Sequence, residues 1–144
     1  MFFSKGSQKI EVFKKVPLFS VLGGRNLKEV SKIADENQVK AGQILVQQGR
    51  GGWHFYLIAE GQARVEKNGK KIRTLGPGEF FGEISLIDRE PRTASVIAES
   101  KMTVLVVSSQ SFTHLLETVP GLYKDMLIAL CKYIRRADQP SICS

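Results

Sequence analysis

The middle of the chain, from about residue 38 to residue 107, consists of short segments rich in Val, Ile, Phe and Tyr that glycines separate. The segments QILVQQ (43–48), HFYLIAEG (54–61) and TASVIAES (93–100) have the length and composition of strands. The separating glycines are Gly42, Gly49, Gly51, Gly52, Gly61, Gly69, Gly76 and Gly78. Many short strands with glycine-rich turns predict a small β-barrel or jelly roll.

One pair of these segments carries a specific turn signal. Asn68-Gly69 lies between RVEK (64–67) and KKIRTL (70–75). Both residues tolerate the positive φ angles of a two-residue turn, so the pair predicts a tight β-hairpin.

Helical spacing flanks the strand region on both sides. Ile10, Phe13 and Val16 are spaced for one face, and NLKEVSKIA (26–34) follows with Asn26 expected as its cap. After the strands, SQSFTHLLETV (109–119) again has helical spacing, and Pro120 is expected to open a last helix. We therefore expect a helical front over about 8–36, a β-roll over about 37–108 and C-terminal helices over about 109–138.

Length and composition favour one globular domain over residues 1–144. The 144 residues include 42% apolar and 24% charged ones, which suits a chain with its own core. No apolar run approaches the roughly 20 residues that cross a bilayer, and polar residues interrupt the N-terminal segment where a signal peptide would be apolar. Cys131 and Cys143 fit no disulfide framework or metal spacing. We expect a cytoplasmic protein without a membrane span.

The net charge of +7 favours anionic partners without choosing among nucleotide, nucleic acid and acidic membrane. The basic residues are spread along the chain instead of being gathered on one recognition helix. A solvated surface is the simpler interpretation, and no direct DNA binding is expected. A nucleic-acid-binding protein stays open as an alternative, which a salt-dependent response to duplex DNA would reveal.

The sequence contains no positive case for catalysis. His54 and His114 are the two histidines, too few for the multi-histidine metal site of catalytic jelly rolls. No GxSxG nucleophile turn is present, and the serines lack an evident His/Asp partner set. We expect a protein that is not an enzyme and that has no metal site and no cofactor.

The stretch FGEISLIDREPRTASV (81–96) combines features that suit a phosphate ligand. Gly82 permits close approach, and a short helical turn from Ile84 and Ser85 would present backbone N–H groups to an anion. Ile84, Leu86 and Ile87 are expected to anchor this turn in the core. The planar guanidinium of Arg92 matches phosphate oxygens, Thr93 adds a hydroxyl, and Ala94 leaves room for a backbone N–H.

Glu83 decides between two interpretations of this stretch. A carboxylate beside a phosphate site is unfavourable unless it accepts hydrogen bonds, and a ribose hydroxyl would supply one. One arginine and one such acceptor suit a cyclic mononucleotide better than a triphosphate, since no GxxxxGK[ST] or GxGxxG loop is present. The alternative is a Glu83–Arg92 surface ion pair, worth at most about 1 kcal/mol if exposed.

FGEISLI followed by PRTASV resembles the phosphate-binding cassette of the cyclic nucleotide-binding domains of cAMP-dependent kinase regulatory subunits, nucleotide-gated channels and catabolite-activator transcription factors. KVPLFSVL, FYLIAEGQARV and LGPGEFFGE extend the resemblance over most of the chain. It implies a mainly β fold, an eight-stranded β-roll or jelly roll (double-stranded β-helix) with an N-terminal helical segment and C-terminal lid helices. It also implies that Glu83 accepts the ribose 2′-hydroxyl and that Arg92 binds the cyclic phosphate. Backbone N–H groups of Gly82, Ile84, Ser85 and Ala94 are expected to assist. The chain departs from the family in the loop QQGRGGW (47–53), where Arg50 and Trp53 stand in place of the usual acidic residues.

The resemblance also suggests how the base is held and how binding produces a signal. Val65 and Leu75 are candidates for an apolar wall, and Tyr133 and Arg136 on the last helix for a cover, with helix packing and a solvated charge as the alternatives. Thr93 is compatible with cGMP and with cAMP; we expect cAMP, with cGMP second. The expected protein is a regulatory domain in signal transduction whose last helix moves and acts on an effector protein. It is expected to stand alone, with a piece of a longer chain as the alternative. A degenerate domain that serves only as a structural protein-interaction module is the other function left open.

Overall fold

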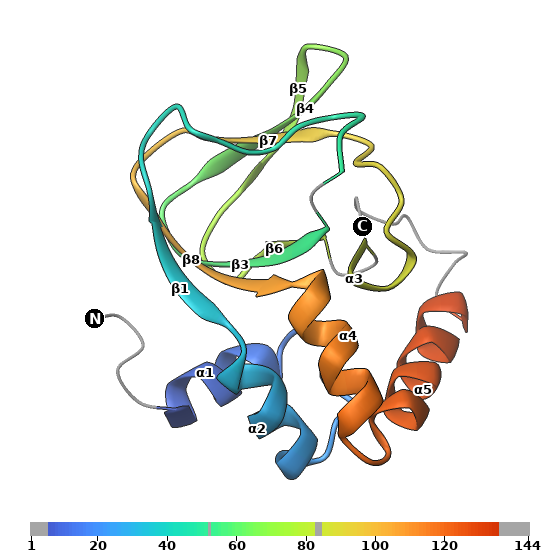
Figure 1. Cartoon of the computed structure of the whole chain (residues 1–144). Helices are drawn as coiled ribbons and strands as arrows, with labels where there is room; N and C mark the ends of the chain where they lie inside the picture. Colours follow the sequence, from blue (N-terminus) through green and yellow to red (C-terminus); the bar gives the residue numbers. More distant parts are fainter. Residues whose placement is uncertain (1–5, 52, 83–84, 136–144) are drawn as a thin grey trace. The chain divides into compact units, whose positions relative to one another are not determined.

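The computed structural model describes residues 6–51, 53–82 and 85–135 (Figure 1). They divide into two compact units. The helical unit comprises residues 6–34 and 110–135, and the strand unit comprises residues 35–109.

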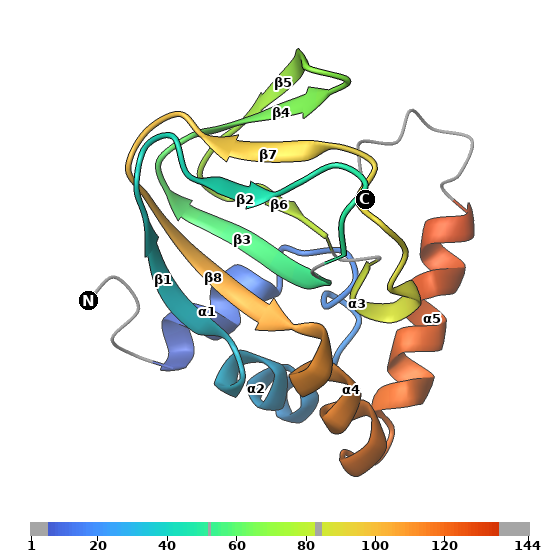
Figure 2. The ribbon, with the colours of Figure 1, turned by 45° about the horizontal axis from the view of Figure 1, so that its top comes forward.

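The described residues of the strand unit form eight strands in two antiparallel sheets (Figure 2). One sheet has the order β1-β8-β3-β6 and the other the order β2-β7-β4-β5. The strands are β1 (Asp35–Val39), β2 (Ile44–Val46), β3 (His54–Glu60), β4 (Ala63–Lys67), β5 (Lys70–Leu75), β6 (Phe80–Phe81), β7 (Ser95–Ala98) and β8 (Met102–Ser108). The helical turn α3 (Ser85–Asp88) lies between β6 and β7 in the chain.

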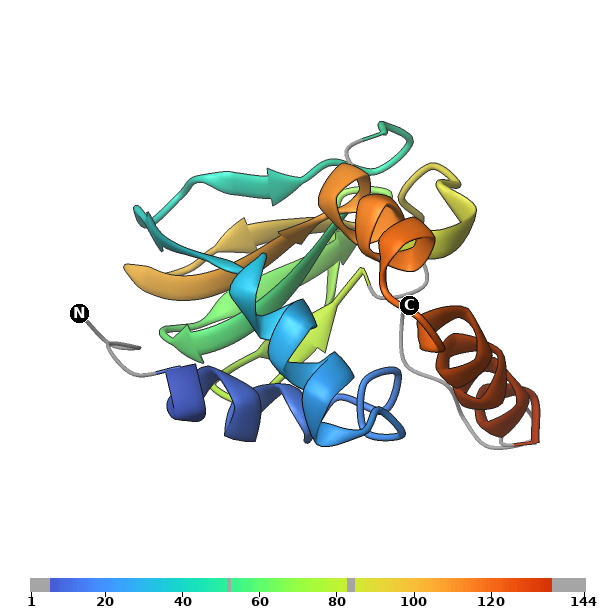
Figure 3. The ribbon, with the colours of Figure 1, turned by 60° about the horizontal axis from the view of Figure 1, so that its bottom comes forward.

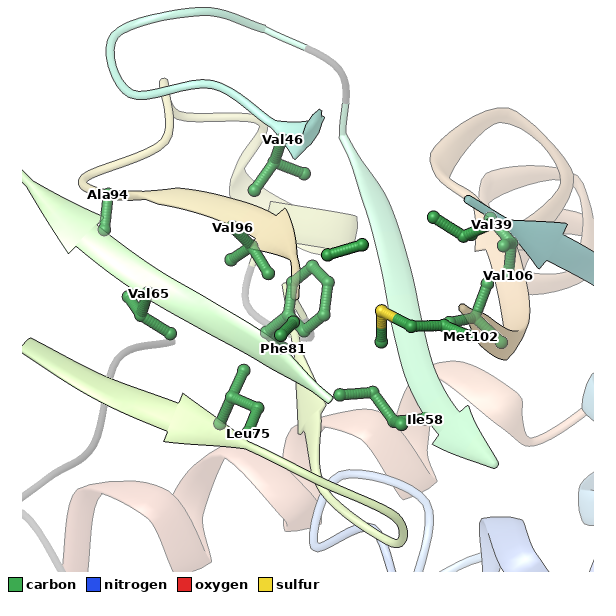
Figure 4. Close-up of a cluster of buried hydrophobic side chains, with 13 residues drawn as sticks. Val39, Val46, Ile58, Val65, Leu75, Phe81, Ala94, Val96, Met102 and Val106 are labelled. Atoms are coloured by element: carbon green, nitrogen blue, oxygen red, sulfur yellow. The ribbon is translucent and has the colours of Figure 1, made fainter. Parts of the chain in front are cut away.

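The core of the strand unit lies between the two sheets. Alternate residues of each strand point inward, and opposed pairs such as Val65 and Val96 meet on one face because the side-chain period of a strand is two. Figure 4 shows these side chains converging from both sheets, with Phe81 near the centre. The prediction of a mainly β roll with flanking helices is confirmed.

The hairpin between β4 and β5 is the one that the sequence predicts. Asn68 and Gly69 have φ angles of 53° and 78°, both in the left-handed region that a two-residue turn requires. The amides of Gln48 and Asn68 also pair: Gln48 Nε2 donates to Asn68 Oδ1 at 3.0 Å, and the Asn68 backbone N–H donates to Gln48 Oε1 at 2.9 Å. This pair joins the hairpin to the loop after β2.

The helical unit contains α1 (Gly6–Phe13), α2 (Gly24–Lys32), α4 (Ser109–Thr118) and α5 (Leu122–Arg135). Figure 3 shows α1 and α2 side by side. Phe19 packs edge-on against Phe13 at 5.5 Å and against Phe112 at 6.0 Å between ring centroids, so the N-terminal segment and α4 share one core. Among the described residues, no helix has the length and apolar character needed to span a bilayer.

Two helix starts differ from the prediction. Helix α2 begins at Gly24 with Gly23 as its cap, and the Asn26 side chain donates instead to Asp125 Oδ2 at 3.0 Å. Pro120 does not open the last helix, because Gly121 follows it with a φ angle of 84° and α5 begins at Leu122. In both places a neighbouring glycine fixes the boundary.

Candidate functional site

Gly82 directly follows β6 and lies against Arg92. Its φ angle is 87°, and a Cβ atom added to it would come within 2.5 Å of both Arg92 Nη1 and the His54 carbonyl oxygen. Only glycine fits there without a shift of the guanidinium or of the β3 backbone. The atoms that approach Gly82 closely belong to Arg92 and β3, and the approach of a phosphate to Gly82 stays a prediction.

Arg92 is a buried cation with a main-chain anchor. Its side chain is only 6% exposed, and Nη2 donates a hydrogen bond to the His54 carbonyl oxygen. Its backbone is fixed as well, since Gly49 N–H donates to Arg92 O at 2.8 Å and Arg92 N–H donates to Arg50 O at 3.2 Å. A permanently charged group is costly to bury unless something compensates it. Glu83 lies outside the described residues, so the alternative of a Glu83–Arg92 ion pair is not tested.

The turn expected after Gly82 is present as α3, whose first residue, Ser85, is buried. Leu86 is 1% exposed and anchors the turn as predicted, whereas Ile87 is 37% exposed, so the prediction for Ile87 is wrong. The short helix ends at Asp88, and the next residue, Arg89, has a φ angle of 56°, in the left-handed region. Glu83 and Ile84 lie outside the described residues, and their roles stay predictions.

Three of the predicted contact residues gather in the core of the strand unit. Val65 on β4, Leu75 on β5 and Ala94 before β7 belong to one apolar cluster with Phe81 (Figure 4). Phe81 directly precedes Gly82, so the apolar cluster continues to the glycine–arginine contact. Thr93 is exposed.

Tyr56 connects this cluster with the second sheet. Its ring stacks on Phe81 at 4.8 Å with an interplanar angle of 14°, and its hydroxyl donates to the Leu45 carbonyl oxygen at 3.3 Å. Burial raises the pKa of the Tyr56 hydroxyl above its ordinary value, and the positive charge of Arg92 acts in the opposite direction. The sequence reasoning missed Tyr56, Phe81 and the His54 carbonyl; for Tyr56, the period-two alternation of FYLIAEG was the available signal.

The proposed cover of the base lies beyond what the structure describes. The backbone at position 133 belongs to α5, but the Tyr133 side chain and the whole of Arg136 lie outside the described residues. Their contact with a ligand stays a prediction.

Taken together, the described part of the site joins a buried guanidinium, a glycine in close contact with it, and an apolar wall. A planar guanidinium pairs well with phosphate oxygens, and the apolar wall suits a flat ring. This combination can bind an anion that carries an apolar body.

Comparison with known proteins identifies relatives of this chain. Residues 36–119, more than half of the chain, match the family model described as the cyclic nucleotide-binding domain. A cGMP-dependent protein kinase of Caenorhabditis briggsae is 34% identical over 126 residues, which cover 83% of this chain and 17% of the kinase. A cAMP-dependent protein kinase regulatory subunit of Hypocrea atroviridis is 32% identical over 111 residues, which cover 77% of this chain and 24% of the subunit. The chain thus spans a quarter or less of the length of these relatives.

The fold has solved counterparts. The N-terminal domain of a transcriptional regulator from Streptomyces coelicolor superimposes with a TM-score of 0.79 and 26% identity, covering 88% of this chain and 92% of that domain.

Proposed function

The chain belongs to the cyclic nucleotide-binding domain family, and on this premise we propose that it is a regulatory sensor that binds cAMP, with cGMP as the second candidate. The observation that supports the proposal is the buried Arg92 guanidinium held against Gly82. Both residues belong to the stretch that carries the family resemblance.

In the proposed complex, Arg92 pairs with the cyclic phosphate. The hydrogen bond to the His54 carbonyl fixes the guanidinium before ligand arrives, so less side-chain entropy is lost on binding. Backbone N–H groups of Gly82, Ile84, Ser85 and Ala94 complete the phosphate contacts. Glu83 accepts the ribose 2′-hydroxyl, which places sugar and phosphate on one short segment.

The base lies against the apolar wall in this proposal. Val65 and Leu75 are each 2% exposed or less, so the base reaches them only if neighbouring side chains of the cluster move aside. Tyr133 and Arg136 cover the opposite face of the base. Thr93 is the residue that a guanine would use, which is why cGMP is the second candidate.

Signalling then results from a shift between two states. Ligand contacts close the turn that begins at Gly82, and the last helix passes the change to an effector protein. A ligand shifts such an equilibrium only through its differential affinity for the two states, so nucleotide and effector must affect each other's binding reciprocally.

The test is a titration of the full chain with cAMP and cGMP, followed by calorimetry and by the emission of Trp53, the single tryptophan. Trp53 is 36% exposed and the Arg89 guanidinium lies 6.0 Å from its ring, so its emission responds to changes near the loop. Replacing Arg92→Leu should weaken binding about 100-fold, the effect of roughly 3 kcal/mol from a lost charged pair. Arg92→Lys keeps the charge, loses the planar fork, and should weaken binding about 10-fold.

The matched control is Arg73→Leu, which removes an arginine of the strand unit that pairs with Glu79 at 2.6 Å. It should leave nucleotide affinity unchanged. Equal affinity in Arg92→Leu and wild type, with circular dichroism showing a folded variant, would exclude the phosphate assignment. Wild-type affinities weaker than millimolar for both nucleotides would favour the structural interaction module.

A further inference from the structure

A cavity of about 310 Å³ lies in the strand unit at a place that the proposed nucleotide site does not use. Its lining comes from β1, β2 and the turn between them, with Tyr56 of β3 and two valines of β8. None of the described residues assigned to the nucleotide lines it. Its volume is at the lower end of the range of about 300–1,000 Å³ typical of ligand pockets.

The strand register explains why the space opens here. β1 is the edge strand of one sheet and β2 the edge strand of the other, so between them the sheets are joined by a turn and not by a ladder. Asn37 lies opposite Val104, and Tyr56 lies opposite Val106. Opposed residues share a face, and Val104 and Val106 belong to the inner core, so Asn37 and Tyr56 also face the space between the sheets.

The lining has a definite chemical character. Val104, Val106 and Leu45 supply apolar surface, and Asn37 and Gln43 supply amides. The Tyr56 hydroxyl donates its proton to the Leu45 carbonyl, so its oxygen lone pairs are directed elsewhere as acceptors. None of the described lining residues is a Lys or an Arg, and the one charged residue, Glu36, lies opposite Leu105, on the other face of β1 from Asn37. An anion such as a nucleotide is therefore disfavoured, in contrast to the site at Arg92.

We propose that this cavity is a second ligand site, which takes an uncharged, planar, bicyclic ring with an amide-like edge. The ring lies on Leu45 and on the accessible edge of Val106. The amide-like edge of the ring accepts a hydrogen bond from the side-chain amide of Asn37 and donates one to the hydroxyl oxygen of Tyr56. A cavity of about ten waters that is lined by amides and a few aliphatic side chains, without a cationic residue, suits such a molecule better than an anion.

The probe is 2-naphthamide, and 2-naphthoate is its anionic counterpart of the same shape. Each is titrated into the isotope-labelled full chain while backbone amide shifts are followed by NMR. The amide should shift the resonances of Asn37, Leu45, Tyr56 and Val104 with a dissociation constant of about 1 mM, as expected for about 13 heavy atoms at ordinary ligand efficiency. The naphthoate should bind at least about 10-fold more weakly.

Two variants test the location. Asn37→Phe places a phenyl ring in the cavity from an exposed position on the edge strand, and it should weaken the binding of 2-naphthamide at least about 10-fold. Lys40→Phe adds the same ring at an exposed position outside the lining and should leave the affinity unchanged. A third variant, Tyr56→Phe, keeps the stacking on Phe81 and removes the hydroxyl. It should weaken the binding of 2-naphthamide about fivefold.

Three results would overturn the proposal. The first is no shift of the cavity amides at 10 mM 2-naphthamide. The second is equal affinity for amide and naphthoate, and the third is equal affinity in Asn37→Phe and Lys40→Phe. Each can be interpreted whether or not cAMP or cGMP binds, because the nucleotide titration is separate.

Discussion

Arg92 is anchored by backbone atoms at both its side chain and its main chain. Its anchor is the His54 carbonyl, and its own main chain pairs with Gly49 and Arg50. A carbonyl acceptor is present whatever side chain stands at that position. The position of the guanidinium therefore depends on the course of β3 and of the loop before it, and on the space that Gly82 leaves.

Gly82→Ala tests that space. The new Cβ meets Arg92 Nη1 and the His54 oxygen at 2.5 Å and also strains a backbone at φ 87°. Gly78→Ala is the matched control, because its φ angle is 86° and nothing lies within 4 Å of its added Cβ. We expect Gly78→Ala to cost about 1–2 kcal/mol of unfolding free energy and Gly82→Ala at least about 1 kcal/mol more, measured by urea unfolding. Nucleotide affinity should fall about 10-fold or more in Gly82→Ala alone; equal losses in both variants would contradict the contact.

Tyr56 gives the strand unit a dependence on alkaline pH. Its pKa is raised in the folded state, so the unfolded chain loses this proton first as pH rises through 10. The unfolding free energy should then decrease until pH passes the folded pKa, with the full contribution present below pH 10. The unfolding free energy of Tyr56→Phe should be about 1 kcal/mol lower below pH 9, because the hydrogen bond to Leu45 is lost. It should also decrease less between pH 9 and 11 than that of the wild type. Parallel pH curves for the two proteins would show that Tyr56 is not the titrating group.

At the scale of elements, the β4–β5 hairpin is held both by its turn and by Gln48. Asn68→Ala places alanine at φ 53° and removes the side-chain bond to Gln48, whereas Gln48→Ala removes both bonds and leaves the turn residue unchanged. We expect losses of about 1–2 kcal/mol for Asn68→Ala and about 0.5 kcal/mol for Gln48→Ala, whose bonds are exposed. Thermal or urea unfolding measures both, and a larger loss for Gln48→Ala would assign the hairpin's stability to the amide pair.

The elements also show which features a sequence can reveal. Asn68-Gly69 predicts its turn because few residues adopt two consecutive positive φ angles. The helix starts predicted from Asn26 and Pro120 are wrong. Gly23 caps α2, and the Asn26 side chain instead has a tertiary partner in Asp125. Gly121, with its positive φ angle, delays the start of α5 beyond Pro120.

The candidate site also combines features that the sequence reveals with features that it does not. The PRTASV segment identifies Arg92 by its chemistry, but its acceptor is a carbonyl 38 residues earlier, and a main-chain carbonyl has no sequence signature. The cavity between β1 and β2 depends on register across three strands, which local patterns do not contain.

At the scale of the whole molecule, ligand binding and folding are linked. A ligand that binds only the folded state adds about 2.7 kcal/mol at about 100 times its dissociation constant. For a chain of 144 residues this corresponds to a rise of roughly 8–10 °C in melting temperature, which differential scanning fluorimetry measures. Arg92→Leu, with affinity about 100-fold weaker, should show a rise of only about 1–2 °C at the same nucleotide concentration, and a rise equal to that of wild type would contradict the assignment. A salt-dependent shift with duplex DNA would instead support the nucleic-acid alternative.

The strand order also bears on how the protein is made. In its sheet, β8 lies between β1 and β3, yet it is the last of the eight described strands to be synthesised. A ribosome-bound chain that has reached Ala98 already carries Gly82, Arg92 and the His54 carbonyl, while β1 and β3 still lack the partner that joins them. During translation, the capacity to bind a ligand should therefore arise in a single late step, when β8 enters the sheet.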